Sequence, residues 1–212
     1  MNSLTSTAKP ALRAPLAALA IMTAVTLLGG CAAPLLVGGA MAGGAMSFTD
    51  RRTTGTQLED ETIELKSVGR LREVLGDRSH VNVTSFNRLV LITGETPTEA
   101  DRVAAEKAVA QIENVRATLN ELAVGSNSAM TARANDTLVT SKVKASYLDA
   151  KDLQSNAIKV VTERGTVFLM GRVTERESTR AGEIARGVGG VARVVKVFEV
   201  ISDADLAKLQ SR

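Results

Sequence analysis

The 212-residue chain has one cysteine, one histidine, one tyrosine and no tryptophan. A single cysteine cannot form a disulfide within the chain, and one histidine without a second thiol does not complete a usual metal-ligand set. A cysteine nucleophile needs a base, and His80 stands at the start of an expected strand, where we expect it to be exposed. The few aromatic residues disfavour base stacking. We therefore expect no enzyme, no metal site, no cofactor and no nucleic-acid partner.

Other catalytic patterns are also missing. The 23 carboxylates fall mainly on expected helix surfaces or in turns, where a solvated charge is the usual role. The glycine-rich stretch at 187–190 lacks the Lys-Ser/Thr pair of a phosphate-binding loop, and no glycine spacing of a dinucleotide site follows a strand. These absences favour a binding or structural protein.

The cysteine stands at the end of an apolar run. Lys9 and Arg13 precede about 15 uncharged residues that end in small ones, the pattern of a secretory signal. The sequence "LGGC" at 28–31 resembles the lipobox of bacterial lipoproteins. That resemblance implies a signal peptide over 1–30, cleavage before Cys31, a diacylglycerol on its thiol, and acylation of the new amino terminus, for example with palmitate.

The segment after the cysteine leaves an alternative open. No charge stands between Arg13 and Asp50, so an uncleaved helical anchor, or more than one span, is long enough to exist. Four glycines at 38–44 instead favour a flexible tether over 31–57. Because alanine follows the cysteine, the lipoprotein resemblance implies sorting to the outer membrane, facing the periplasm.

The remainder contains an internal repeat. Residues 81–124 and 158–200 align at an offset of 77, with one residue dropped near Pro97. Each copy predicts two strands joined by a turn, an alanine-rich helix and a last strand, after a helix at about 63–75 or 136–148. We therefore expect an α+β protein with two tandem αββαβ units, each a three-stranded mixed sheet covered by two helices on one face. In the last strands, the residues expected to face inward are Leu122, Val124, Phe198 and Val200.

Units of about 65 residues are near the lower size limit for independent stability, so we expect the two to pack against each other. In the second unit, Thr174 and Glu177 have the spacing of a capping box that begins its second helix.

The strand "GTVFLMG" at 165–171, the later Gly190-Val191 turn and "DRRTTGTQLEDE" at 50–61 resemble the BON domain of bacterial envelope proteins, present twice behind a lipobox. The resemblance implies BON domains at 58–125 and 135–202, a linker at 126–134 and a C-terminal tail at 203–212. The first copy departs from the family pattern at Asn87-Arg88 and Glu113-Asn114.

The two units differ in charge. Residues 58–124 carry 8 basic and 12 acidic side chains, a net of −4, whereas residues 129–201 carry 12 basic and 8 acidic ones, a net of +4. A basic unit tethered beside a bilayer meets anionic headgroups favourably, by about 1 kcal/mol per Lys or Arg at the surface. The second unit is therefore the candidate lipid-binding unit.

The candidate contact element is the helix at 135–149. We expect Asp136 to be its N-cap and Val139, Val143 and Tyr147 to form its buried stripe. An exposed leucine between lysines can enter the lipid interface, which gives the candidate phospholipid-binding residues Leu138, Lys142, Lys144 and Ala145. The alternative is that Leu138 belongs to the core and the lysines are simply solvated.

The resemblance implies the function in more detail. Such proteins bind anionic phospholipids, here phosphatidylglycerol or cardiolipin, through the second domain and support outer-membrane integrity. The alternative is a protein–protein adaptor in the envelope, for example with the outer-membrane protein assembly machinery. Regulation of a peptidoglycan-cleaving enzyme is a third possibility.

Overall fold

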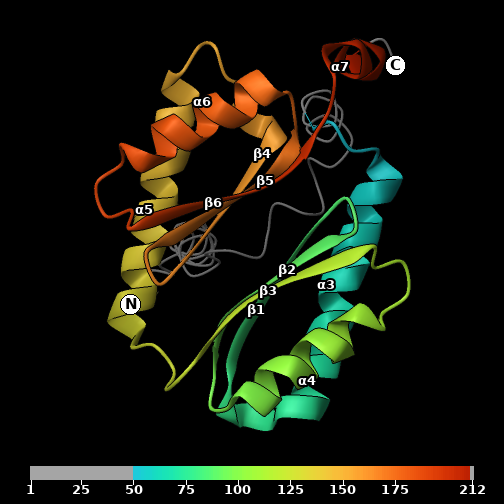
Figure 1. The fold of residues 1–212 in the computed structure, drawn as a ribbon, viewed down its shortest axis with the longest axis vertical. Helices are drawn as coiled ribbons and strands as arrows, with labels where there is room; N and C mark the ends of the chain where they lie inside the picture. The colour runs from blue at the N-terminus through green and yellow to red at the C-terminus, as the bar shows by residue number, and fades with distance from the viewer. Residues whose placement is uncertain (1–49, 211–212) are drawn as a thin grey trace, which may run out of the picture. The chain divides into compact units, whose positions relative to one another are not determined.

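The computed structural model describes residues 50–210 (Figure 1). The expected signal peptide, Cys31 and most of the expected tether lie outside this range. The described residues lie within one compact unit. Both hydrophobic cores and the contacts between the two domains lie within it, so a fragment of residues 46–212 contains the whole described fold.

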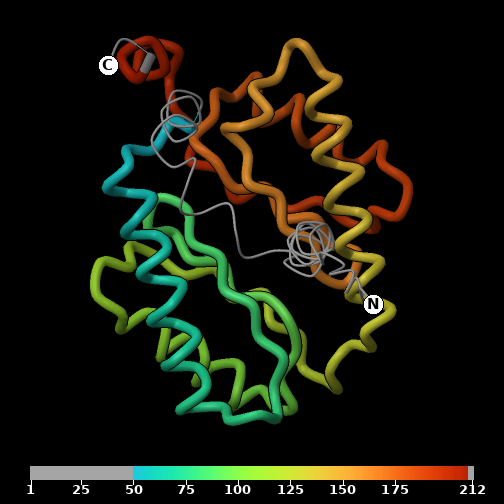
Figure 2. Tube along the Cα trace, turned by 180° about the vertical axis from the view of Figure 1, so that it is seen from behind, coloured from blue at the N-terminus to red at the C-terminus, as the bar shows by residue number. Residues whose placement is uncertain are grey.

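The first domain contains α3 (Thr54–Leu75), the 3₁₀ turn η1 (Gly76–Arg78), β1 (His80–Phe86), β2 (Leu89–Thr96), α4 (Glu99–Ala110) and β3 (Ala117–Val124). The sheet order is β1-β2-β3, with β1 antiparallel and β3 parallel to β2. Both helices cover the same face of this sheet in the two opposite views (Figures 1 and 2). The expected αββαβ arrangement is confirmed.

The second domain repeats this order. It contains α5 (Met130–Asp149), η2 (Ser155–Ala157), β4 (Ile158–Glu163), β5 (Thr166–Val173), α6 (Glu175–Arg186) and β6 (Arg193–Val200), and α7 (Asp203–Gln210) follows. Its sheet order is β4-β5-β6 with the same strand directions. The capping box of Thr174 and Glu177 is present at the start of α6.

The first helix of each domain is longer than expected. α3 begins at Thr54, where the Thr53 side chain accepts the backbone N–H of Thr56, and α5 begins at Met130, within the expected linker. Asp136 is therefore not the N-cap of α5. It lies buried within the helix, and its carboxylate accepts the backbone N–H groups of Arg164 at 2.8 Å and Gly165 at 2.9 Å.

The hairpin turn held by that aspartate has a counterpart in the first domain. Asp60 of α3 accepts the backbone N–H groups of Asn87 and Arg88, each at 2.8 Å. The φ angles are 50° and 66° at Asn87 and Arg88, and 52° and 71° at Arg164 and Gly165. Two consecutive left-handed residues are the geometry of a type I′ hairpin turn. The first copy thus makes the same turn although it lacks the glycine.

Each domain has its own core between the helices and the sheet. Val90, Ile92 and Leu122 belong to the first, and Val167 and Leu169 to the second, where Phe198 packs at the edge. The inward positions expected for Val124 and Val200 are wrong, because these side chains are 49% and 52% exposed. Each is the last residue of its strand, beyond the part of the sheet that the helices cover.

The opposite faces of the two sheets pack against each other. The interdomain cluster joins five buried residues with four partly buried ones: Phe86, Leu91, Phe168, Met170, Val197, Leu89, Leu119, Val161 and Val195. Alternate residues of a strand point to opposite faces, so Leu169 lies in the domain core while Phe168 and Met170 lie in this cluster. The expected packing of the two units is confirmed.

Charged pairs surround this cluster. Lys159 meets Glu64 at 2.9 Å, and Arg193 meets Glu121 at 3.2 Å. In both pairs the basic residue comes from the second domain and the acidic one from the first. A third pair has the reverse polarity, because Arg116 of the first domain meets Glu199 of the second at 3.4 Å. The opposite net charges of the two domains therefore serve the contact between them only in part, and other basic groups of the second domain face solvent.

Candidate functional site

The orientation of α5 is fixed by its buried stripe. Val139, Val143 and Tyr147 are at most 1% exposed, as expected from their spacing. The Tyr147 hydroxyl donates a hydrogen bond to the backbone carbonyl of Ala181 at 3.0 Å, and burial raises the pKa of this phenol. A helix held this way must present its opposite side outward.

The outer side of α5 carries the candidate residues. Leu138 is 60% exposed, and Lys142, Lys144 and Ala145 are also exposed. Leu138 is thus not a core residue, contrary to the alternative. Among the described residues, neither lysine ammonium is paired with a carboxylate. We call these four residues, together with Met130 and Leu148, the outer face of α5.

Two apolar residues of this face were missed in the sequence. Met130 is 75% and Leu148 is 70% exposed. Met130 lies in the part of the helix that was expected to be a linker. Leu148 is ten residues after Leu138, a spacing that places both on one side of a helix. The signal for Leu148 was present, and the helix spacing alone could have identified it.

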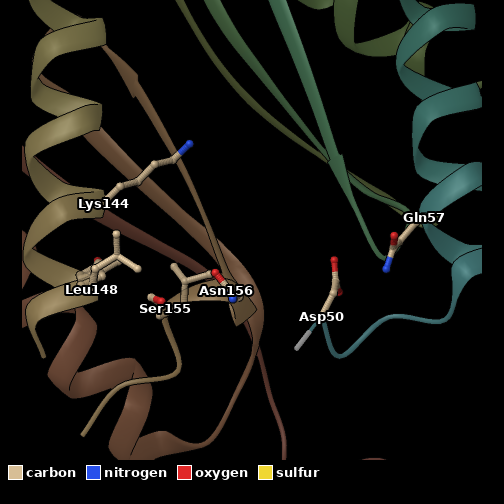
Figure 3. A pocket seen from close by; sticks show the side chains of 8 residues that line it. Asp50, Gln57, Lys144, Leu148, Ser155 and Asn156 are labelled. Atoms are coloured by element: carbon tan, nitrogen blue, oxygen red, sulfur yellow. The ribbon is translucent and has the colours of Figure 1, made fainter. Parts of the chain in front are cut away.

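A cavity of about 460 Å³ lies beside the C-terminal half of α5. Figure 3 shows Lys144 and Leu148 extending from the helix, with Ser155 and Asn156 on the same side of the cavity and Asp50 and Gln57 on the other. Ammonium, amide and hydroxyl groups are donors that suit a phosphate oxygen. The negative charge of Asp50 would repel an anion in this cavity, although the carboxylate of Asp50 is paired with Arg52 at 2.7 Å.

Two arginines before α3, also missed in the sequence, connect the segment 50–53 to both domains. Arg51 makes two hydrogen bonds of 2.7 Å to the Glu177 carboxylate of the second domain. This pairing with Arg51 holds the pKa of Glu177 below its usual value, although burial opposes it. Arg52 bonds Asp60 of the first domain at 2.8 Å and lies over the Phe86 ring at 4.2 Å from its centre. This segment therefore holds the domains together beside the cavity.

His80 is less exposed than expected. Its side chain is 19% exposed, and its Nδ1 lies 3.0 Å from a carboxylate oxygen of Glu95, which is fully buried. Exposure at the start of a strand is the rule for a sheet with one open face, but here the second domain covers that face. Glu95 and Glu163 stand beside His80, with one candidate ligand atom of each residue within 4.8 Å of the others.

Among residues 50–210, no helix has the length and apolar character needed to cross a membrane.

Comparison with known proteins agrees with the two-domain organisation. The family description of the BON domain matches residues 60–126 and 135–202. The chain is 35% identical over 190 residues to the outer membrane lipoprotein DolP of Haemophilus influenzae. The aligned region covers 88% of this chain and 97% of the relative.

Two further relatives are more distant. The 21 kDa hemolysin of Actinobacillus pleuropneumoniae is 31% identical over 154 residues, with 72% of this chain and 79% of the relative covered. Osmotically-inducible protein Y of Escherichia coli is 28% identical over 148 residues, with 66% and 72% covered.

Proposed function

The chain belongs to the BON-domain family, and from this we propose that it is a non-catalytic, lipid-anchored envelope protein that binds anionic phospholipid through its second BON domain. The observation that carries the proposal is the outer face of α5. It exposes Leu138 together with Lys142 and Lys144, which lack carboxylate partners among the described residues. Phosphatidylglycerol and cardiolipin are the lipids with the matching charge.

The proposed anchor is Cys31, through the lipobox described above. The resemblance to an outer membrane lipoprotein over 88% of this chain supports this attachment, and with it a place on the periplasmic side of the outer membrane. Acyl chains contribute about 0.8 kcal/mol per buried CH₂ group, so a multiply acylated terminus remains on the bilayer.

The anchor and the helix have different roles in this proposal. Each lysine near an anionic surface contributes about 1 kcal/mol, and a buried leucine side chain about 2 kcal/mol. These amounts give only weak binding from solution. A tether converts the contact into an intramolecular one with a high effective concentration, so weak contacts suffice to hold the second domain against the membrane. Support of outer-membrane integrity would follow from that position.

Liposome flotation of the 46–212 fragment tests the lipid contact without the anchor. We expect binding to vesicles that contain phosphatidylglycerol or cardiolipin, and weaker binding as salt shortens the range of electrostatic attraction from about 10 Å at 0.1 M to about 3 Å at 1 M. The double variant Leu138→Ala, Lys142→Ala should reduce the vesicle-bound fraction about tenfold, since it removes apolar and charged contacts together.

The matched control is the pair Leu58→Ala, Lys66→Ala on α3, which removes the same side-chain types from the first domain. Leu58 is 65% exposed and the Lys66 side chain is 51% exposed. The control should bind vesicles as the unchanged fragment does. Equal loss in both double variants, or binding that ignores salt and lipid charge, would refute the proposed role of α5.

The second candidate function is protein–protein docking, for example with the outer-membrane protein assembly machinery. An apolar strip on α3 favours it: Leu58, Leu65 and Val68 are 65%, 76% and 52% exposed, and their spacing places them on one side of the helix. In this case a photo-crosslinker at position 65 would capture one envelope protein in cells, and the α5 double variant would leave lipid binding unchanged.

A further inference from the structure

The residues around His80 form a polar cluster at the boundary between the domains. His80 on β1 and Glu95 on β2 are directly opposite each other in the first sheet. Both lie on the face that carries the interdomain cluster, and Glu163, at the end of β4, comes from the second domain. One candidate ligand atom from each of the three side chains lies within 4.8 Å of the other two.

The hydrogen bonds of the cluster orient the imidazole. Oε2 of Glu95 lies 3.0 Å from Nδ1 of His80 and also accepts from the Ser128 hydroxyl at 3.3 Å. A zinc ion between Oε2 and Nδ1 would take the place of the shared proton, because the separation of these two atoms is close to that of two ligand atoms on one metal ion. The other ring nitrogen, Nε2, lies 3.5 Å from the side-chain nitrogen of Asn82.

Glu95 itself is incompletely satisfied. Its side chain is 0% exposed, and its Oε1 atom has no hydrogen-bond donor among the described residues. The nearest cation is the guanidinium of Arg164 at 3.7 Å, on a side chain that is 52% exposed and can turn into solvent. A buried carboxylate oxygen without a donor is costly, and a cation placed beside it would remove that cost.

Glu163 completes the cluster from the other domain. It is 7% exposed, and one oxygen accepts a hydrogen bond from Asn82 at 2.9 Å. Burial raises the pKa of Glu163, and the nearby Glu95 and Asp136 raise it further, whereas the Asn82 bond and His80 lower it. A cavity of about 340 Å³, lined in part by His80, Asn82, Arg133 and Glu163, gives access to the cluster.

We infer that His80, Glu95 and Glu163 bind a divalent zinc ion that links the two BON domains. One imidazole and two carboxylates are donors that zinc accepts, with water in the remaining position. Ligand atoms on a tetrahedral zinc ion lie about 3.3 Å apart, so small side-chain rotations would close the cluster. Calcium and magnesium prefer all-oxygen sites and should bind far more weakly.

The test uses the 46–212 fragment without a polyhistidine tag, titrated with zinc chloride. Because His80 is the only histidine in the chain, its imidazole proton NMR signals are free of overlap with other histidines. We expect these signals to shift and to saturate at one equivalent of zinc, with no such change for calcium or magnesium. The midpoint of thermal unfolding should rise by about 5 °C at saturation, since the ion binds only the folded, docked state.

Variants locate the site. Glu163→Gln and Glu95→Gln, one from each domain, should each weaken zinc binding about tenfold or more in calorimetry. Glu175→Gln is the control, because Glu175 is exposed and its replacement makes the same charge change. This variant should bind zinc as tightly as the unchanged fragment does. His80 signals that do not respond to one equivalent of zinc, or undiminished binding by Glu163→Gln, would overturn the inference. The NMR result on the unchanged fragment stands even where a variant folds poorly.

Discussion

Replacing Gly94 with alanine is expected to unfold the first domain. Gly94 has a φ of 115°, which side chains rarely adopt, and a β-carbon there would lie 2.0 Å from the backbone oxygen of His80. The obstacle is the backbone of the paired strand β1, which cannot move without breaking the sheet. A steric conflict of this kind, together with the strained φ, should cost more than about 4 kcal/mol.

Urea denaturation of the 46–212 fragment measures the effect of Gly94→Ala. The matched control is Gly69→Ala, because Gly69 is exposed in the middle of α3 and a β-carbon there meets nothing within 4 Å. Alanine in a helix interior is favoured over glycine by about 1 kcal/mol, so the control should be stabilised. The two substitutions should therefore change the free energy of unfolding in opposite directions. An unchanged denaturation midpoint for Gly94→Ala would contradict the described strand pairing.

Replacing Asp60 with alanine is expected to have the second large effect. Its carboxylate is 2% exposed and accepts the Ser85 hydroxyl at 2.6 Å, the Arg52 guanidinium at 2.8 Å and the two N–H groups of the hairpin turn. Removal leaves several buried donors and a partly buried guanidinium without this acceptor. The expected loss is about 3–5 kcal/mol of unfolding free energy.

Asp136→Ala should cost less, because among residues 50–210 Asp136 accepts hydrogen bonds only from the two backbone N–H groups of its turn. The exposed Asp77→Ala serves as a control and should change stability by no more than about 0.5 kcal/mol. Equal stability of Asp60→Ala and Asp77→Ala in urea would contradict the role of Asp60.

The contribution of the Asp60 carboxylate to the free energy of unfolding should decrease at acidic pH. Burial disfavours the charged carboxylate, but the hydrogen bonds from Ser85, Arg88, Arg52 and Asn87 outweigh it and hold the pKa of Asp60 below its ordinary value of 3.8. Its contribution is thus fully present above pH 3.8 and is lost as the pH falls through the lower folded value. The stability gap between Asp60→Ala and the unchanged fragment should narrow in that acidic range.

The repeat predicted the fold because its signals are local. Gly94 in β2 and Gly171 in β5 match in sequence and also in role, since a β-carbon at Gly171 would meet the backbone of Ala157, the residue just before β4. The turns, capping box and buried stripe of α5 depend on residues a few positions apart. Such patterns can be read along the chain.

The remaining features depend on distant residues. The local sequence predicts Asp136 as a helix cap, but its actual role depends on Arg164 and Gly165, which are 28 and 29 residues away. The arrangement of His80, Glu95 and Glu163 exists only once the two sheets are packed together. One signal was overlooked: the continuous apolar runs "LVLI" and "VFLM" indicate strands buried on both faces, and so predict the packing of sheet on sheet.

The contact between α5 and the membrane can be measured with one added fluorophore. The chain has no tryptophan, so Leu138→Trp in the 46–212 fragment supplies the only indole emission. Vesicles containing phosphatidylglycerol should shift this emission to shorter wavelength, whereas phosphatidylcholine vesicles should not, and Leu58→Trp on α3 should be unaffected by either. An emission from position 138 that stays at its solvent-exposed wavelength with anionic vesicles would contradict the proposed lipid contact.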